Sequence, residues 1–176
     1  MAFILAASPV LAGIAVLIRA SGPGGVFYRQ RRVGLDGREF DMLKFRTMQI
    51  EAEAAGAVWS SAGDPRRTEI GAILRRFSLD ELPQLWNVLL GDMSLVGPRP
   101  NLFNQEELIN ARNALGIYSV RPGITGLAQI KNIDMTTPEL LAKTDAEMIS
   151  TMSIANYFKY IFLTVAGNGQ GDRIRR

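Results

Sequence analysis

Asp80 and Glu81 are the residues of this chain best suited to covalent chemistry. They follow the basic pair Arg75 and Arg76 and stand where a helix is expected to begin. The chain contains no histidine and no cysteine, so imidazole and thiolate catalysis are excluded. A carboxylate can act as a nucleophile, and a second one as a general base. An enzymatic function would therefore depend on this pair of acids.

Two uses of the pair are open on local grounds. The positive end of a helix dipole, together with Arg75 or Arg76, would keep Asp80 ionised, able to ligate Mg²⁺ through one oxygen and to attack phosphorus with the other. The spacing from Ser78 to Glu81 is also that of a capping box, which is a purely structural arrangement. Spacing alone favours the structural use, so the surrounding motifs have to decide.

Three other segments have features that suit phosphate groups. Arg99 lies between two prolines, which would hold its guanidinium rigidly for bidentate contact. Lys44 and Arg46 form a cationic pair at the end of a predicted strand. Residues 121–126, Arg-Pro-Gly-Ile-Thr-Gly, form a predicted loop whose glycines let a backbone approach a ligand. Taken singly, these segments also read as an exposed turn, a solvated strand edge and a common glycine loop.

The composition favours anionic partners. At 176 residues the chain has the length of one domain. Its net charge of +3 fits nucleic acid, an anionic bilayer or a phosphorylated substrate. Residues 1–18 contain no charged side chain, which indicates contact with a membrane. The segment lacks the basic start that is typical of a secretory signal peptide. Between residues 19 and 48, seven basic side chains outnumber three acidic ones, which places the following chain on the cytoplasmic side.

Ser8 and Pro9 stand inside this apolar segment. A straight helix of 18 residues would reach roughly 27 Å, only just enough for a hydrocarbon core of about 30 Å. Pro9 removes an amide and crowds the preceding turn, so we expect the helix to break or kink there, with the Ser8 hydroxyl as a local donor. On these residues alone, a re-entrant helix and a kinked spanning helix are both open.

The remaining chain predicts a hairpin followed by helices. Residues 26–33 and 38–46 alternate partially with period two, and turn residues at 34–37 join them. A loop is expected over 51–64. Helices are expected over 68–77, from Ser78 or Asp80 to Gly91, over 104–115, over 138–152 with Thr137 as cap, and over 154–166. The last helix has four aromatic side chains and a single charge, which suits either the membrane interface or the core.

Six blocks, in order, resemble those of one protein family. They are Ser8-Pro9, Phe27-Tyr28-Arg29-Gln30-x-Arg32-Val33-Gly34, Lys44-Phe45-Arg46-Thr47-Met48, Ser78-Leu79-Asp80-Glu81-Leu82-Pro83-Gln84-Leu85-x-Asn87, Gly91-Asp92-Met93-Ser94-x-Val96-Gly97-Pro98-Arg99-Pro100 and Arg121-Pro122-Gly123-Ile124-Thr125-Gly126. The chain resembles the catalytic domain of the bacterial monotopic phosphoglycosyl transferases, the polyprenyl-phosphate sugar-1-phosphate transferases.

The resemblance implies a fold and a location. The fold would be α-dominated α+β, with a re-entrant membrane helix over 1–20 that is broken at Ser8-Pro9. A catalytic domain over 21–176 would contain a short β-hairpin and interfacial helices. The protein would be monotopic, on the cytoplasmic face of the bacterial inner membrane.

The resemblance also implies a reaction. A sugar-1-phosphate, at family level that of an N-acetylated hexose, would pass from a UDP-sugar to polyprenyl (undecaprenyl) phosphate with release of UMP, as the first membrane step of a glycoconjugate pathway. Asp80 matches the nucleophile, which would carry the phosphosugar in a ping-pong cycle beside Mg²⁺. Glu81 matches the second acid, which would position or deprotonate the acceptor. Substrate contacts are expected from Lys44, Arg46, Arg75, Gln84, Arg99, Arg121 and Lys131.

The chain departs from the family in three places. Fewer residues precede the serine-proline pair than in relatives, so a truncated amino terminus is expected. The family's glycine-arginine step after Gln129 is missing, so the family's phosphate contact is either absent or moved to Lys131. Tyrosines near Asp145 are replaced by Glu147 and Met148. The rival interpretation is a non-catalytic relative that keeps the fold. Nucleic-acid binding rests on charge alone and is not expected, and the oligomeric state does not follow from the sequence.

Overall fold

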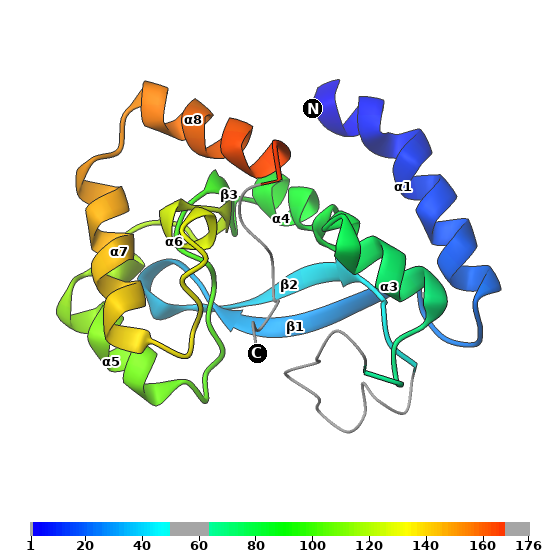
Figure 1. Cartoon of the computed structure of the whole chain (residues 1–176), viewed down its shortest axis with the longest axis horizontal. Helices are drawn as coiled ribbons and strands as arrows, with labels where there is room; N and C mark the ends of the chain where they lie inside the picture. Colours follow the sequence, from blue (N-terminus) through cyan, green and yellow to red (C-terminus); the bar gives the residue numbers. More distant parts are fainter. Residues whose placement is uncertain (1, 50–63, 168–176) are drawn as a thin grey trace. The chain divides into compact units, whose positions relative to one another are not determined.

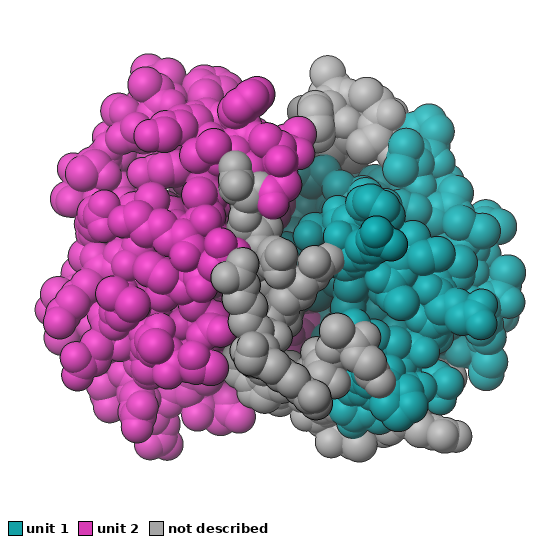
Figure 2. Space-filling view, in the orientation of Figure 1, with its two compact units in different colours: residues 1–29, 43–86, 171–176 teal, residues 30–42, 87–170 magenta. Residues whose placement is uncertain are grey.

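The computed structural model describes residues 2–49 and 64–167, with the helical backbone alone over residues 2–7. Figure 1 shows the elements along the chain. They group into two compact units, drawn in two colours in Figure 2. Of the described residues, the first unit contains 2–29, 43–49 and 64–86, and the second contains 30–42 and 87–167.

Helices dominate the described chain, and the strands form two small two-stranded sheets. The predicted α-dominated α+β class is therefore confirmed. The loop expected over 51–64 falls, except for Asp64, outside the described residues.

Helix α1 (Ala2–Ala20) runs through Pro9 without interruption. The predicted break at Ser8-Pro9 is not found, because a proline removes one backbone donor and a helix can accommodate that loss as a bend. Among the helices of the described residues, none combines the length and the apolar character needed to cross a membrane. The re-entrant course of this segment stays a prediction.

One face of α1 belongs to the core of the first unit. Ile14 and Ile18, four residues apart, are 7 % and 1 % exposed and pack with Phe45 and Leu74. Each such burial contributes about 1.5–3 kcal/mol. Other apolar side chains of α1 are exposed to solvent: Val10, Val16 and Leu17. The domain boundary expected at residue 20 stays a prediction.

Strands β1 (Phe27–Val33) and β2 (Glu39–Phe45) pair as predicted. The short turn η1 (Leu35–Gly37) joins them, with φ of 54° at Asp36 and 72° at Gly37. Aspartate and glycine tolerate this left-handed region, so the chain can reverse sharply here.

Helix α3 (Glu69–Arg76) also forms as predicted, and Thr68 Oγ1 accepts a hydrogen bond from the Gly71 amide at 2.9 Å. The single helix expected next is instead a short 3₁₀ turn, η2 (Leu79–Glu81), followed by α4 (Gln84–Leu90).

The predicted capping box is wrong. Ser78 has φ of 55° and makes no capping hydrogen bond with its side chain. Pro83 has no amide with which to bond Leu79 in the α-helical pattern, and the Leu82 amide donates to the Leu79 carbonyl at 3.3 Å instead.

In the second unit, β3 (Ser94–Val96) and β4 (Gly123–Thr125) form a parallel pair with Ser94 opposite Gly123. The loop expected over 121–126 therefore contains a strand. Gly97 directly follows β3, and a Cβ atom added to it would meet the backbone of residues 121–123, while one added to Gly123 would meet the backbone of Gly97. These glycines allow two strands to approach closely, which differs from the ligand approach expected from the sequence.

Helices complete the second unit: α5 (Glu106–Ala114), η3 (Ile117–Ser119), α6 (Leu127–Ile130), α7 (Pro138–Ser150) and α8 (Ile154–Val165). The predictions for α5, α7 and α8 are confirmed, although Thr137 makes no capping bond with its side chain at the start of α7. Two buried clusters hold these helices together, one around Val96, Met148 and Tyr160 and one around Leu108, Ala128 and Leu141.

Candidate active site

Asp80 and Glu81 lie in turn η2 of the first unit and are only 7 % and 8 % exposed. Burying two adjacent acids is costly unless cations or hydrogen-bond donors surround them. Lys44, at the buried end of β2, supplies one cation: its Nζ lies 3.5 Å from Glu81 Oε1. The acid pair is thus enclosed beside a cation, which a capping box on the surface would not require.

Asp80 does not stand at the start of a regular helix. Asp80 belongs to a single 3₁₀ turn, and α4 begins four residues later at Gln84. A macrodipole acts mainly at the ends of a regular helix. A helix dipole at Asp80, as expected from the sequence, is therefore not what the structure provides, and a cation that accompanies the acid pair is Lys44 beside Glu81.

Thr47 orients Arg75, which lies in the last turn of α3. Arg75 Nε donates to Thr47 Oγ1 at 2.9 Å, and the Thr68 amide donates to the Thr47 carbonyl at 3.1 Å. Turn η2 packs against the same helix. Thr47 is a positioning residue to which the sequence analysis gave no role. The feature of the sequence that could have pointed to Thr47 is its position between Arg46 and Met48 in a family block.

Arg46 is held by carbonyls at the end of α1. Its guanidinium donates to the carbonyls of Ile18 and Gly22, both at 3.3 Å, and to that of Pro23. One of these carbonyls belongs to the last turn of α1 and the other two to the segment that follows it, so Arg46 fixes the chain where it leaves the helix. Its expected contact with a substrate phosphate stays a prediction.

Gln84 is buried at the first position of α4, with 1 % of its surface exposed. Within the described part of the chain, its Nε2 has no hydrogen-bond partner. A buried donor left in this state costs about 1–3 kcal/mol. Such a group calls for a ligand or an ordered water as its partner.

The other expected contacts, Arg99, Arg121 and Lys131, belong to the second unit. Lys131 Nζ lies 3.0 Å from Glu147 Oε2, and both side chains are about half exposed. Two of the chain's departures from the family pattern thus form an ion pair with each other. The expected phosphate contact of Lys131 stays a prediction.

Arg112 organises a buried network that the sequence analysis missed. Its Nε and Nη2 donate to Asp145 Oδ2 at 3.1 and 2.6 Å. Its Nη1 donates to the Arg99 carbonyl at 2.8 Å and to Asn101 Oδ1 at 2.9 Å. Burial raises the pKa of Asp145, against the opposing effect of Arg112. The network fixes the backbone of Arg99, and a single arginine in a polar helix gave no signal of this role.

The acid pair offers hard oxygen donors to a metal ion. The described residues contain no cluster of three or more acidic, histidine or cysteine side chains. Mg²⁺ is usually bound by one or two carboxylates, with waters and substrate phosphates completing the shell. Asp80 and Glu81 fit that kind of site.

The comparisons with known proteins show the family of the chain. The profile of the family described as Bacterial sugar transferase matches residues 1–169. The chain therefore belongs to the bacterial sugar transferase family.

Three relatives illustrate the range of names in the family. The chain is 47 % identical over 137 residues to a UDP-glucose:undecaprenyl-phosphate glucose-1-phosphate transferase of Xanthomonas campestris pv. campestris, covering 75 % of this chain and 28 % of the relative. It is 41 % identical over 165 residues to a protein of the same name from Caulobacter vibrioides, covering 90 % and 62 %. It is 43 % identical over 125 residues to a UDP-N-acetylgalactosamine-undecaprenyl-phosphate N-acetylgalactosaminephosphotransferase of Aeromonas hydrophila, covering 70 % and 30 %. The chain thus spans less than two thirds of each relative.

Proposed function

We propose that this chain transfers a sugar-1-phosphate from a UDP-sugar to polyprenyl phosphate, with release of UMP. The observation that carries the proposal is the buried pair of Asp80 and Glu81 beside Lys44. In a chain without histidine or cysteine, these adjacent carboxylates can supply both a nucleophile for a covalent phosphoryl intermediate and a base. The names of the relatives support both substrates.

The proposed reaction has two displacements at the same phosphorus. In the first, an Asp80 carboxylate oxygen bonds to the β-phosphorus of the UDP-sugar, and the bond to the UMP oxygen breaks. In the second, a phosphate oxygen of the acceptor bonds to that phosphorus, and the aspartyl bond breaks to restore Asp80. Glu81 positions the acceptor or takes its proton, and Lys44 offsets the negative charge that gathers around the reacting groups. The product is polyprenyl-diphospho-sugar.

Other residues would hold the phosphates and the metal. Mg²⁺, held by Asp80 with Glu81 nearby, would neutralise phosphate charge. The unpaired Gln84 amide is a donor for a substrate oxygen, and Arg75, oriented by Thr47, is a guanidinium for a phosphate. Substrate contacts are also proposed for Arg46, Arg99, Arg121 and Lys131.

The relatives' names include more than one sugar, and the donor of this chain is proposed to be one of them. Glucose appears in two of the names and N-acetylgalactosamine in the third. The N-acetylated hexose expected from the sequence is therefore one of two donors to test first.

We further propose a monotopic attachment to the cytoplasmic face of the inner membrane, with α1 re-entrant. Exposed apolar side chains on α1 support contact with lipid. On α8 they form one stripe: Ile154, Phe158, Phe162 and Val165. These positions recur every three or four residues, so they share one face of the helix. Exposed apolar faces of this kind suit the membrane interface.

The test is to detect the intermediate directly. The purified chain is incubated with Mg²⁺ and a panel of UDP-glucose, UDP-N-acetylglucosamine and UDP-N-acetylgalactosamine, without acceptor. UMP release is measured, and peptide mass spectrometry locates any phosphosugar adduct. We expect one donor to give an adduct on Asp80 and Asp80→Asn to lose more than about a thousandfold in rate. The matched control is Asp41→Asn at an exposed position.

Two outcomes would overturn the proposal. A folded Asp80→Asn variant that releases UMP at the wild-type rate would refute the nucleophile. A wild-type chain that folds, binds the donor and yields neither UMP nor an adduct would instead favour the non-catalytic relative.

A further inference from the structure

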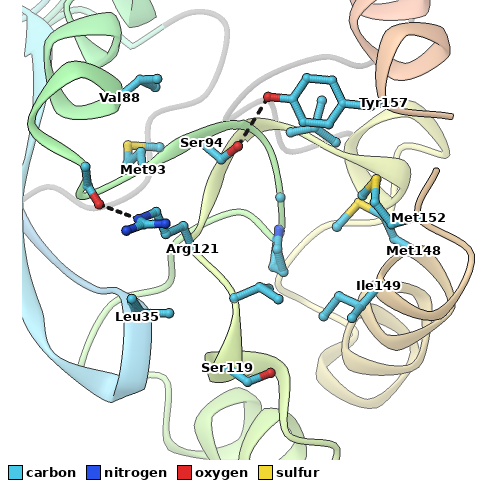
Figure 3. Close-up of a pocket in the computed structure, with 15 residues that line it drawn as sticks. Leu35, Val88, Met93, Ser94, Ser119, Arg121, Met148, Ile149, Met152 and Tyr157 are labelled. Carbon is cyan, nitrogen blue, oxygen red and sulfur yellow. Dashed lines mark hydrogen bonds between the residues drawn. The ribbon is translucent and has the colours of Figure 1, made fainter. Parts of the chain in front are cut away.

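The second unit contains a pocket of about 620 Å³ to which the two proposed displacements assign no ligand (Figure 3). Among the residues that line it, Arg121 is one of the proposed substrate contacts. This volume lies in the range of small-molecule sites. Its wall includes strand β3, the residues just before β3 and just before β4, and parts of helices α7 and α8. Its lining is mostly apolar, with a cation on one wall and a pair of hydroxyls on another.

The cation is Arg121, which stands two residues before β4. Its Nε donates to the Gly91 carbonyl at 2.7 Å, as Figure 3 shows. For its two terminal nitrogens, the described residues provide no hydrogen-bond partner. One bond therefore fixes the guanidinium, and its other donors are left for a ligand. Paired donors in this planar arrangement match a phosphate group.

The hydroxyls belong to Ser94 on β3 and Tyr157 on α8, whose oxygens are 3.3 Å apart. A single proton joins the two oxygens, so the pair keeps a second proton with which it can donate to a ligand oxygen.

The remaining wall is apolar and adaptable. Met93, Met148 and Met152 contribute to it, and Figure 3 shows Met148 and Met152 together with Ile149 on one side. Methionine side chains are flexible and polarizable, so they adapt to hydrocarbon groups of irregular shape. Tyr157 belongs to α8, the helix whose exposed stripe is proposed to lie in the membrane interface.

We infer that this pocket binds a phosphate ester that carries a hydrocarbon chain, with the phosphate at Arg121 and the chain among the methionines. Two lipids have this chemistry, namely polyprenyl phosphate and an anionic phospholipid. Charge complementarity at Arg121 and the position of Tyr157 on α8 favour a lipid over a soluble ligand. The inference rests on the proposed function only for the first of these two lipids.

The experiment uses the full chain in phosphatidylcholine nanodiscs with a farnesyl phosphate that carries a benzophenone at its chain end. Irradiation couples benzophenone preferentially to methionine, and peptide mass spectrometry maps the adducts. We expect most adducts on Met152, which is 39 % exposed, and fewer on Met148, which is buried. Labelling should fall about tenfold in Arg121→Gln, because a charge-assisted contact of this size is lost. Met152→Glu, which adds a repelling charge at a partly exposed position, should reduce labelling of Met148 similarly.

The controls are Lys143→Gln and Leu140→Glu, exposed positions of α7 that do not line the pocket. Both should label like the wild type. Competition separates the two sources: undecaprenyl phosphate alone displacing the probe identifies the acceptor, and phosphatidylglycerol displacing it equally well identifies bulk lipid. Either result supports the inference.

Three results would overturn it: no adducts on the pocket methionines, unchanged labelling in both pocket variants, or displacement by UDP but by neither lipid. The last would make the pocket a nucleotide site. UMP release by the same preparation reports separately on the proposed function. Specific labelling of a chain that releases no UMP would refute the enzyme and leave the lipid pocket standing.

Discussion

The buried ion pair of Arg112 and Asp145 makes a quantitative prediction about stability. Both residues are 1 % exposed. Asp145→Ala removes the carboxylate that accepts from Nε and Nη2 of Arg112, at 3.1 and 2.6 Å. Among the described residues, the guanidinium then keeps hydrogen bonds to the Arg99 carbonyl and the Asn101 side chain, with the Tyr118 hydroxyl as a further neutral neighbour. Leaving a buried charge without its counter-ion costs about 3–5 kcal/mol, a large part of the 5–15 kcal/mol that typically stabilises a domain.

The intact pair itself should contribute little, because burial raises the pKa of Asp145 despite the nearby arginine. Replacing both partners with apolar residues of similar size, as in Arg112→Met with Asp145→Leu, should therefore restore much of the loss. The assay is urea unfolding of wild type, both single variants and the double variant, followed by circular dichroism. The control is Lys131→Gln, which breaks an exposed pair and should change stability by less than about 1 kcal/mol.

Two results would contradict this reasoning. If Asp145→Ala costs no more than Lys131→Gln, the carboxylate is not required to balance the buried charge. If the double variant is less stable than either single variant, the pair is itself a strong source of stability. The apparent affinity of Asp145→Ala for the UDP-sugar can be measured under conditions in which the variant is folded. A loss of affinity would indicate that the network positions the segment around Arg99.

Three further predictions concern the strand pair, pH and the membrane. Gly123→Ala should destabilise the chain by about 3 kcal/mol or more in urea unfolding, because its Cβ would meet the backbone of the neighbouring strand; a change within 0.5 kcal/mol would refute the close approach. Hydrogen bonds from Arg66 lower the pKa of Asp64 from 3.8 to about 2. Because the folded pKa is the lower one, the stabilisation is complete above the unfolded value and is lost as pH falls through about 2. NMR titration of the carboxyl group checks this, and a midpoint near 3.8 in the folded chain would contradict it. Phe162→Glu should weaken vesicle binding in flotation by about tenfold or more, and Phe103→Glu, equally charged and outside α8, should not; equal effects would argue against the α8 stripe.

Some elements could be predicted because their cause is local. Alternation and turn residues gave the hairpin, and Pro138 marked the first residue of α7. Asp80 and Glu81 could be singled out because a chain without histidine or cysteine has few other groups for covalent chemistry. That they are buried beside Lys44 was not visible in the sequence.

The sequence by itself therefore determined the residue types available for chemistry and the elements whose signals lie within a few residues. Tertiary structure decided how three-residue strands pair across 26 intervening positions, and which side chain meets Arg112. The physical reason is range. Helix caps, turns and periodicity act between neighbours in the chain, whereas strand pairing and buried charge pairs depend on contacts that form only when distant segments are packed together.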